Sequence, residues 1–254
     1  MSRIKNLFKV QSKKVIPYIT AGYPSKDLTV DLVLAAEKSG AAMIELGMPF
    51  SDPLADGPII QESSQVAIKN NVDIGWILDT VSQIRLQSEI PLVLMGYINP
   101  IIKYGMNNFI CDCSKVGVDG LIIPDLPPEE SIEYISVAKK YNVSPILLIA
   151  PNSTNERIAY ISGLAQDLVY CVSILGITGS NVSSNERLEL YMQRVKNHSK
   201  CPYVIGFGIK NKNDVRNINL ISDGAVIGTA LIEKLGHSND PVASIAKFIK
   251  ELLD

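Results

Sequence analysis

Short hydrophobic runs recur along the chain and alternate with amphipathic segments. The runs are rich in Val, Ile and Leu and cover residues 15–20, 43–47, 91–97, 120–125, 145–150, 168–173, 203–208 and 224–228. Each run is nearly continuous in its hydrophobicity, as is typical of parallel strands that are covered on both faces. The pattern therefore predicts eight buried strands.

The segments between these runs have the spacing of helices. In residues 28–39, apolar positions recur every three or four residues, while Asp31, Glu37 and Lys38 carry charges. Such a stripe predicts an amphipathic helix. Further helices are predicted over residues 74–87, 129–141, 155–165, 185–197, 212–222 and 240–253.

Eight strand–helix units without a Pro-, Gly- or Ser-rich linker favour an α/β fold closed into a (β/α)8, or TIM, barrel. We expect residues 1–254 to form a single domain. The segment Arg3–Lys9 is predicted to be a short extra helix that closes the N-terminal end of the barrel. An open, doubly wound sheet is the alternative, although no Gly-x-Gly-x-x-Gly motif follows the first strand.

Composition and charge exclude several classes of protein. The net charge is −2 and Lys and Arg are scattered, so we expect no nucleic-acid partner. No run approaches the ~20 apolar residues of a membrane span, and no secretory leader is visible. The Cys111–Cys113 pair lacks a second pair or a nearby His, so no metal is predicted. Free thiols favour a reducing compartment, and therefore a cytoplasmic location. The heavy use of Ile, Asn and Lys indicates an AT-rich genome, bacterial or plastid, so the plastid stroma is the alternative location.

Glu45 is the most informative polar residue, because it lies inside a predicted buried strand. An unpaired buried carboxylate is costly. One interpretation is a structural glutamate within a hydrogen-bond network. The other is a carboxyl group with a raised pKa, able to give and take a proton near neutral pH.

A shaped loop follows this strand, with the sequence PFSDPLADGP. Asp52 is suited to a turn, and Asp56 either caps the next helix or acts on a ligand. Carboxyl groups on a rigid strand and on the loop above it suit acid/base chemistry by two groups. Glu45 and Asp56 are therefore the candidate catalytic pair.

Glycines gather at the ends of the last three predicted strands. Gly179 follows the sixth, Gly208 ends the seventh, and Gly228 with Thr229 ends the eighth. TIM barrels commonly bind phosphate after strands seven and eight, on bare amides and a helix N-terminus. With no Lys or Arg assigned to these loops, a phosphate is expected to rest on amides, hydroxyls and the helix dipole. Turn formation is the alternative explanation for the glycines.

The segment IELGMPFSDPLADGPIIQ (44–61) closely resembles the tryptophan synthase α-subunit family. The resemblance continues through PYITAGYP (17–24), LMGYINPI (94–101), GLIIPDLPPEE (120–130), SILGITGS (173–180) and GFGI (206–209), and so covers essentially the full chain. It implies a lyase that cleaves indole-3-glycerol phosphate into indole and glyceraldehyde 3-phosphate, without a metal or organic cofactor.

The resemblance also implies residue roles. The general acid/base falls on Glu45, and Asp56 stabilises the charge that develops at the indole nitrogen. The remaining implied positions bind substrate: Tyr18, Met95, Leu121 and Phe207 around the indole, Tyr170 near the catalytic groups, Thr178 in a lid over the ligand, and Gly179, Gly208, Gly228 and Thr229 around the phosphate.

The family passes indole to a pyridoxal-phosphate-dependent β subunit in an α2β2 complex. By resemblance, residues 51–58, Asn99 and the segment after Asp125 map to that interface. Thr229 replaces a frequent Ser, and Ile174 and Leu175 precede the lid where small or polar residues are common. Two other functions stay open: another phosphate-binding barrel enzyme, such as an isomerase or indole-glycerol-phosphate synthase, and a non-catalytic activator of the β subunit.

Overall fold

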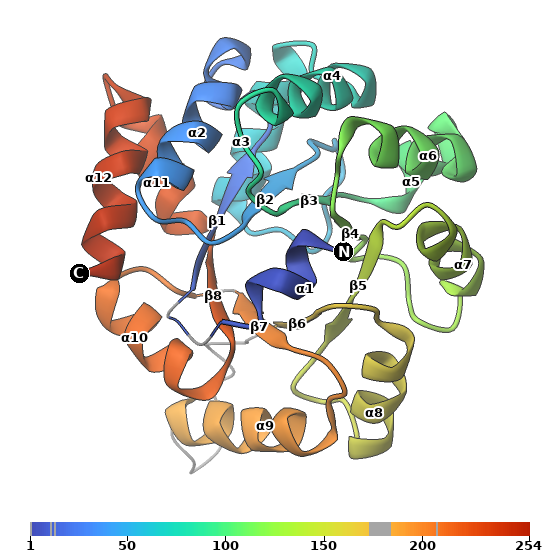
Figure 1. Ribbon diagram of the computed structural model, residues 1–254. Helices are drawn as coiled ribbons and strands as arrows, with labels where there is room; N and C mark the ends of the chain where they lie inside the picture. The colour runs from blue at the N-terminus through green and yellow to red at the C-terminus, as the bar shows by residue number, and fades with distance from the viewer. Residues whose placement is uncertain (1, 11, 13, 173–183, 207) are drawn as a thin grey trace.

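A computed structural model of the chain describes all residues except 1, 11, 13, 173–183 and 207. Parallel strands pair in chain order, β1 to β8, and β8 closes on β1 (Figure 1). The strands are β1 (Val15–Thr20), β2 (Ile44–Gly47), β3 (Leu92–Met95), β4 (Gly120–Ile122), β5 (Ser144–Ile149), β6 (Val169–Val172), β7 (Tyr203–Gly206) and β8 (Gly224–Ile227). The predicted TIM barrel is confirmed, and the open sheet is excluded.

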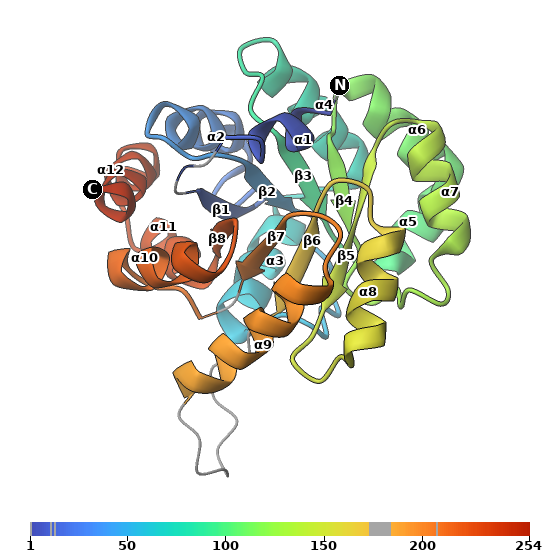
Figure 2. The same ribbon diagram turned by 60° about the horizontal axis from the view of Figure 1, so that its bottom comes forward.

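Helices surround the strands. They are α1 (Arg3–Leu7), α2 (Thr29–Lys38) after the 3-10 turn η1 (Lys26–Leu28), α3 (Pro58–Lys69), α4 (Ile74–Arg85), α5 (Ile98–Tyr104), α6 (Met106–Val116), α7 (Ile132–Lys140), α8 (Asn155–Leu164), α9 (Ser184–His198), α10 (Lys212–Ile221), α11 (Thr229–Gly236) and α12 (Pro241–Leu253). Figure 2 shows the ring, with α8 beside α9 and α11 beside α12. Among the described residues, no helix is long and apolar enough to cross a membrane.

The sequence pattern did not predict α3, α5, α6 or α11. Helix α3 shows why, because its buried face includes Ser63 and Ser64. The Ser63 hydroxyl bonds the hydroxyl of Thr20 at 2.7 Å and donates to the carbonyl of Ile60 at 2.8 Å. Small hydrogen-bonded side chains allow close packing on β1 but give no hydrophobic periodicity to detect.

The strands separate two apolar cores. Along β1, Ile16 and Tyr18 belong to the cluster inside the barrel, while Val15 and Ile19 belong to the cluster between barrel and helices. This alternation follows from the two-residue period of a strand. Every second residue of a strand therefore points to the barrel axis, and the last such residue reaches the C-terminal end.

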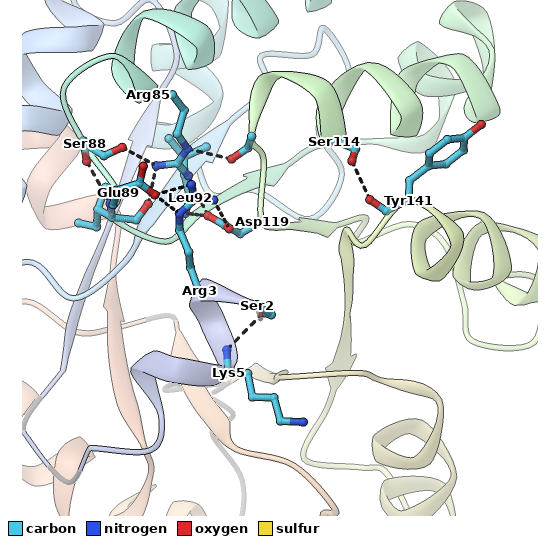
Figure 3. A network of polar contacts seen from close by, with 12 residues as sticks. Ser2, Arg3, Lys5, Arg85, Ser88, Glu89, Leu92, Ser114, Asp119 and Tyr141 are labelled. Carbon is cyan, nitrogen blue, oxygen red and sulfur yellow. Dashed lines mark hydrogen bonds and ion pairs between the residues drawn. The ribbon is translucent and has the colours of Figure 1, made fainter.

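Helix α1 closes the N-terminal end of the barrel, as the sequence predicted (Figure 1). Its Ile4 is fully buried within the inner cluster. Figure 3 shows Arg3 bonded to Asp119 and Glu89. The Asp119 carboxylate also accepts hydrogen bonds from Arg85 at 2.7 Å and from the Leu92 amide at 2.9 Å. These contacts tie the closing helix to strands β3 and β4.

Candidate active site

A cavity of about 410 Å³ lies at the C-terminal ends of the strands, opposite α1. It is lined by Tyr18, Glu45, Asp56, Ile59, Ile60, Met95, Tyr170, Gly208, Ile209, Lys210, Val226, Gly228, Thr229, Ala230 and Glu233. The strand alternation brings Tyr18, Met95, Tyr170 and Val226 to the inner face of the barrel. The cavity occupies the face on which TIM-barrel enzymes place their active sites.

Glu45 lies in β2, with Tyr18 of β1 and Val93 of β3 as its register partners. Its side chain lines the cavity, yet the residue is only 1% exposed. Burial, and to a lesser degree the nearby Asp56 carboxylate, raises the pKa of Glu45 to about 8. A carboxyl group with this pKa is protonated at neutral pH and can exchange its proton there, as a general acid/base must.

Asp56 lies in the loop between β2 and α3, which Tyr97 holds in place. The Tyr97 hydroxyl donates to Asp56 Oδ2 at 3.0 Å and accepts the Ala55 amide at 3.0 Å. The Tyr97 ring stacks on Phe50, with centroids 5.3 Å apart. Burial raises the pKa of Asp56, and the hydrogen bond from Tyr97 opposes that rise. Tyr97 thus positions the Asp56 carboxyl group and favours its charged form, against the larger effect of burial.

Two tyrosines form much of the floor of the cavity. The rings of Tyr18 and Tyr170 cross over the neighbouring strands, and their hydroxyl groups occupy the space in which a Cβ would stand at Gly47 and Gly206. Burial raises the pKa of both hydroxyl groups, so both stay protonated. Glycine at these two strand ends therefore makes room for an aromatic floor.

The other end of the cavity matches the predicted phosphate site. Gly208 has a φ of +80°, and Gly228 is the N-cap of α11, which begins at Thr229. The amides of a first helical turn have no partners within the helix, and they favour anions. The sequence analysis missed Lys210, which lines this cavity two residues after Gly208. The glycine loops themselves contain no Lys or Arg, so this cation comes from the residues that follow the loop after β7.

Leu121 is a second correction. It belongs to the outer cluster against the helices, whereas its neighbour Ile122 belongs to the inner cluster with Met95. The register pairs Met95 with Ile122, which fixes this orientation. The strand alternation then directs Leu121, one residue earlier, to the outer face.

Other lining residues lay outside the sequence prediction. Ile59 and Ile60 come from the unpredicted helix α3, and Ala230 and Glu233 come from the unpredicted helix α11. Thr178, Gly179 and Phe207, together with Ile174 and Leu175, lie outside the described residues. Among the residues that the structure does describe, no group of His, Cys, Asp or Glu could hold a metal ion.

A buried glutamic acid and a loop-borne aspartate line one cavity at the C-terminal face of this TIM barrel, an arrangement suited to an enzyme that uses acid/base chemistry. Residues 4–252 match the family model described as tryptophan synthase alpha chain. The chain belongs to that family. Its activity is the lyase activity of that subunit within the tryptophan synthase complex.

Known relatives and solved structures match this chain along nearly its whole length. The tryptophan synthase alpha chain of Petrotoga mobilis is 44% identical over 250 residues, 98% of this chain and 96% of the relative. That of Prosthecochloris aestuarii is 43% identical over 249 residues, 94% and 93% of the two chains. The structure of subunit alpha from Legionella pneumophila superposes with a TM-score of 0.91 at 34% identity, covering 99% of this chain and 97% of that one.

Proposed function

We propose that Glu45 and Asp56 catalyse the retro-aldol cleavage of indole-3-glycerol phosphate in this cavity. The observation that carries the proposal is that two carboxyl groups in different environments face one cavity. Glu45 is fully enclosed on a rigid strand, whereas Asp56 is partly buried on a loop held by Tyr97. Different environments give two carboxyl groups different pKa values, and this allows them to take different roles in one reaction.

The chemistry needs only proton transfers. Protonation of indole C3 by Glu45 places positive charge on the ring nitrogen, whose N–H then donates to Asp56. Glu45, now a carboxylate, removes the proton of the glycerol hydroxyl next to the ring. The electron pair of that O–H bond forms the aldehyde, the C–C bond breaks, and its electron pair restores the indole ring. The proton lost by Glu45 is thereby recovered, so no cofactor is required.

The cavity provides an apolar end and an anion-binding end for such a substrate. Tyr18, Met95 and Tyr170 offer an aromatic and aliphatic surface for indole. Gly208, Gly228 and Thr229 offer amides and a hydroxyl for phosphate. We assign Thr178, Gly179 and Phe207 to the same site from the family resemblance alone.

The partner is a tryptophan synthase β subunit. The structure of the tryptophan synthase complex from Pyrococcus furiosus superposes with a TM-score of 0.87 at 32% identity, covering 96% of this chain and 98% of that one. The resemblance places residues 51–58, Asn99 and the segment after Asp125 at the interface, and large apolar side chains are exposed there: Leu54 is 93% exposed and Ile132 65%. The Ile98 amide donates to Asp125 Oδ1 at 3.0 Å, which joins two of these segments.

We also propose that residues 1–254 are one TIM-barrel domain, since a single family match runs from residue 4 to residue 252. We further propose a cytoplasmic location, because the four cysteines are free thiols, as is usual in a reducing compartment. The relatives described above are bacterial, so the plastid alternative gains no support.

The deciding experiment measures indole release from indole-3-glycerol phosphate by the wild type and by Asp56→Asn, with Asp52→Asn as the matched control. Asp52 is on the same loop and is exposed, outside the cavity lining. We expect Asp56→Asn to lose most activity and Asp52→Asn to keep it. Equal activity in the two variants would contradict the role of Asp56, and no indole from the wild type with its β subunit would contradict the function.

A further inference from the structure

The cavity has an unbalanced set of charges along its described lining. Three carboxyl groups line the cavity, and Glu45 is protonated at neutral pH, so Asp56 and Glu233 supply the negative charge and Lys210 supplies the single cation. A phosphate monoester carries about −1.5 to −2 charges at neutral pH. Such an anion would enter a cavity with more negative than positive groups. Its affinity should therefore depend strongly on the one ammonium group, that of Lys210.

Lys210 is anchored at the rim of the cavity by its backbone. Asp214 Oδ2 accepts hydrogen bonds from the Lys210 amide at 2.9 Å and from the Asn211 amide at 3.3 Å. Asn211 in turn caps α10 and accepts the Asp214 amide. This reciprocal cap fixes the Cα of Lys210 just after Gly208, while the side chain stays exposed.

The ammonium group of Lys210 has no ion pair among the described residues. Glu233 lines the same cavity and stands four residues after Thr229 on α11. Residues four apart share a helix face, so the Glu233 carboxylate is directed to the same end of the cavity as the Thr229 hydroxyl. A cation and an anion that do not neutralise each other therefore border the glycine-lined end.

We propose that Lys210 binds the phosphate group of the substrate and that Glu233 opposes it, so that this pair sets the affinity for a doubly charged ligand. The proposal rests on the proposed function, because it takes a phosphate ester as the ligand. The Gly208, Gly228 and Thr229 backbone orients the phosphate, and Lys210 adds the charge that uncharged amides lack. Glu233 limits that attraction, which allows the phosphorylated product, glyceraldehyde 3-phosphate, to leave.

The test uses the full chain and glycerol 3-phosphate as the probe, titrated by calorimetry at low ionic strength. Lys210→Met should weaken binding about fivefold, the scale of an exposed ion pair with a doubly charged group. Lys210→Arg should restore most of the affinity, because it restores the charge. Lys212→Met, at the first residue of α10 and outside the cavity lining, changes the net charge equally and should leave affinity unaltered.

Glu233→Gln should act in the opposite direction and tighten binding about twofold. Raising the salt concentration should bring Lys210→Met and the wild type closer together, since exposed charges are screened. In turnover, Lys210→Met should raise KM for indole-3-glycerol phosphate and leave kcat unchanged. Equal affinities in Lys210→Met and Lys212→Met, or equal losses in Lys210→Met and Lys210→Arg, would overturn the proposal.

Failure of the proposed function gives a different result. Suppose that neither the wild type nor the variants form indole, but binding of glycerol 3-phosphate still depends on Lys210. The phosphate contact then stands and the assigned reaction is wrong. If indole forms normally and KM is the same in Lys210→Met and the wild type, the reaction stands and the role of Lys210 falls.

Discussion

Tyr97 donates its hydroxyl hydrogen to Asp56 Oδ2 at 3.0 Å and accepts the amide hydrogen of the preceding residue, Ala55, at the same distance. Both bonds join the end of β3 to the loop after β2. The Tyr97 hydroxyl therefore links the loop that carries Asp56 to the neighbouring strand, at the carboxyl group and at the amide before it.

Tyr97→Phe should keep the ring stacked on Phe50 and remove both hydrogen bonds. Since hydrogen bonds to charged groups are worth about 1.5–3 kcal/mol, we expect kcat to fall about tenfold or more. The pKa of Asp56 should rise, because the bond from Tyr97 lowers it. Tyr104→Phe is the control, as its hydroxyl donates to Asp112 outside the cavity lining. Similar steady-state rates for the two variants would remove Tyr97 from the positioning of Asp56.

Glu45→Gln should abolish most cleavage, because loss of a general acid/base typically costs about 10²–10⁴-fold and Glu45 serves twice. The binding of glycerol 3-phosphate should persist, since the amide is isosteric. A variant that keeps more than about a tenth of the wild-type rate would remove Glu45 from proton transfer.

The same substitution should stabilise the protein without ligand as the pH rises. The pKa of Glu45 rises from 4.5 to about 8 on folding, so between these values the folded state binds a proton that the unfolded state does not. The free energy of unfolding of the wild type therefore falls as the pH increases from 4.5 to about 8. Glu45→Gln lacks this dependence, and its thermal midpoint should exceed that of the wild type by a margin that grows across this range. A constant margin would show that Glu45 is charged throughout.

Gly228→Val should block the anion end of the cavity with little cost to folding. The φ of Gly228 is −114°, outside the positive range that favours glycine, and a Cβ there meets Tyr18 at ordinary contact distance, 3.4 Å. We expect the affinity for glycerol 3-phosphate to fall more than about tenfold, as a buried phosphate loses its amide contacts. Gly208→Val is the less clean variant, because its φ of +80° adds backbone strain. Calorimetric binding together with a thermal melt separates the two effects, with Gly163→Val in α8 as the control.

The fold was predictable from the sequence because buried parallel strands leave continuous apolar runs, and all eight were found. The missed helix α3 packs with serine hydroxyls, which a hydrophobic pattern does not register. Glu45 was predictable because a carboxyl group in such a run is conspicuous. Leu121 was misplaced because a continuous apolar run does not show which of its residues faces inward, and only the register assigns Ile122 to the inner cluster. Lys210 was missed because it lies two residues beyond Gly208, outside the glycine motif, and its place in the cavity lining becomes visible only in the folded chain.

Asp119 and Asp167, two aspartates at the N-terminal end of the barrel, should respond differently to substitution by Asn. Asp119 accepts the amide of Leu92, its partner across the strand pair, and Asp223 accepts that of Tyr203 in the same way. The β5–β6 register places Asp167 opposite Pro145, which has no amide hydrogen. Accordingly, Asp167 Oδ2 is buried without a hydrogen-bond partner among the described residues.

Asp119→Asn breaks the ion pair with Arg85, whose side chain is only 10% exposed, and should cost about 3 kcal/mol. Asp167→Asn changes a carboxyl group whose Oδ2 has no donor among the described residues, and it should leave the free energy of unfolding equal or higher. Urea titrations of both variants measure the two differences. A larger loss in Asp167→Asn than in Asp119→Asn would contradict the register argument.

Addition of a β subunit should accelerate cleavage by this chain. Asp56 lies on a loop whose tip, Leu54, is 93% exposed, and the resemblance places that tip in the subunit interface. A partner that covers Leu54 orders the loop and the carboxyl group that follows it. Ordering of a catalytic loop of this kind commonly limits turnover in the free enzyme.

We expect the isolated chain to bind substrate and to turn it over slowly, with a rise of about one to two orders of magnitude, or about 1.4–2.7 kcal/mol of barrier, when β subunit is added. Steady-state indole formation, titrated with β subunit from the same source, measures this rise. Leu54→Asp is the matched variant, because it leaves the cavity lining unchanged and places a charge on the covered tip. It should keep the basal rate and lose the stimulation, since burying that charge opposes association. A wild-type rate unmoved by β subunit would mean that Tyr97 alone holds Asp56 in its working position.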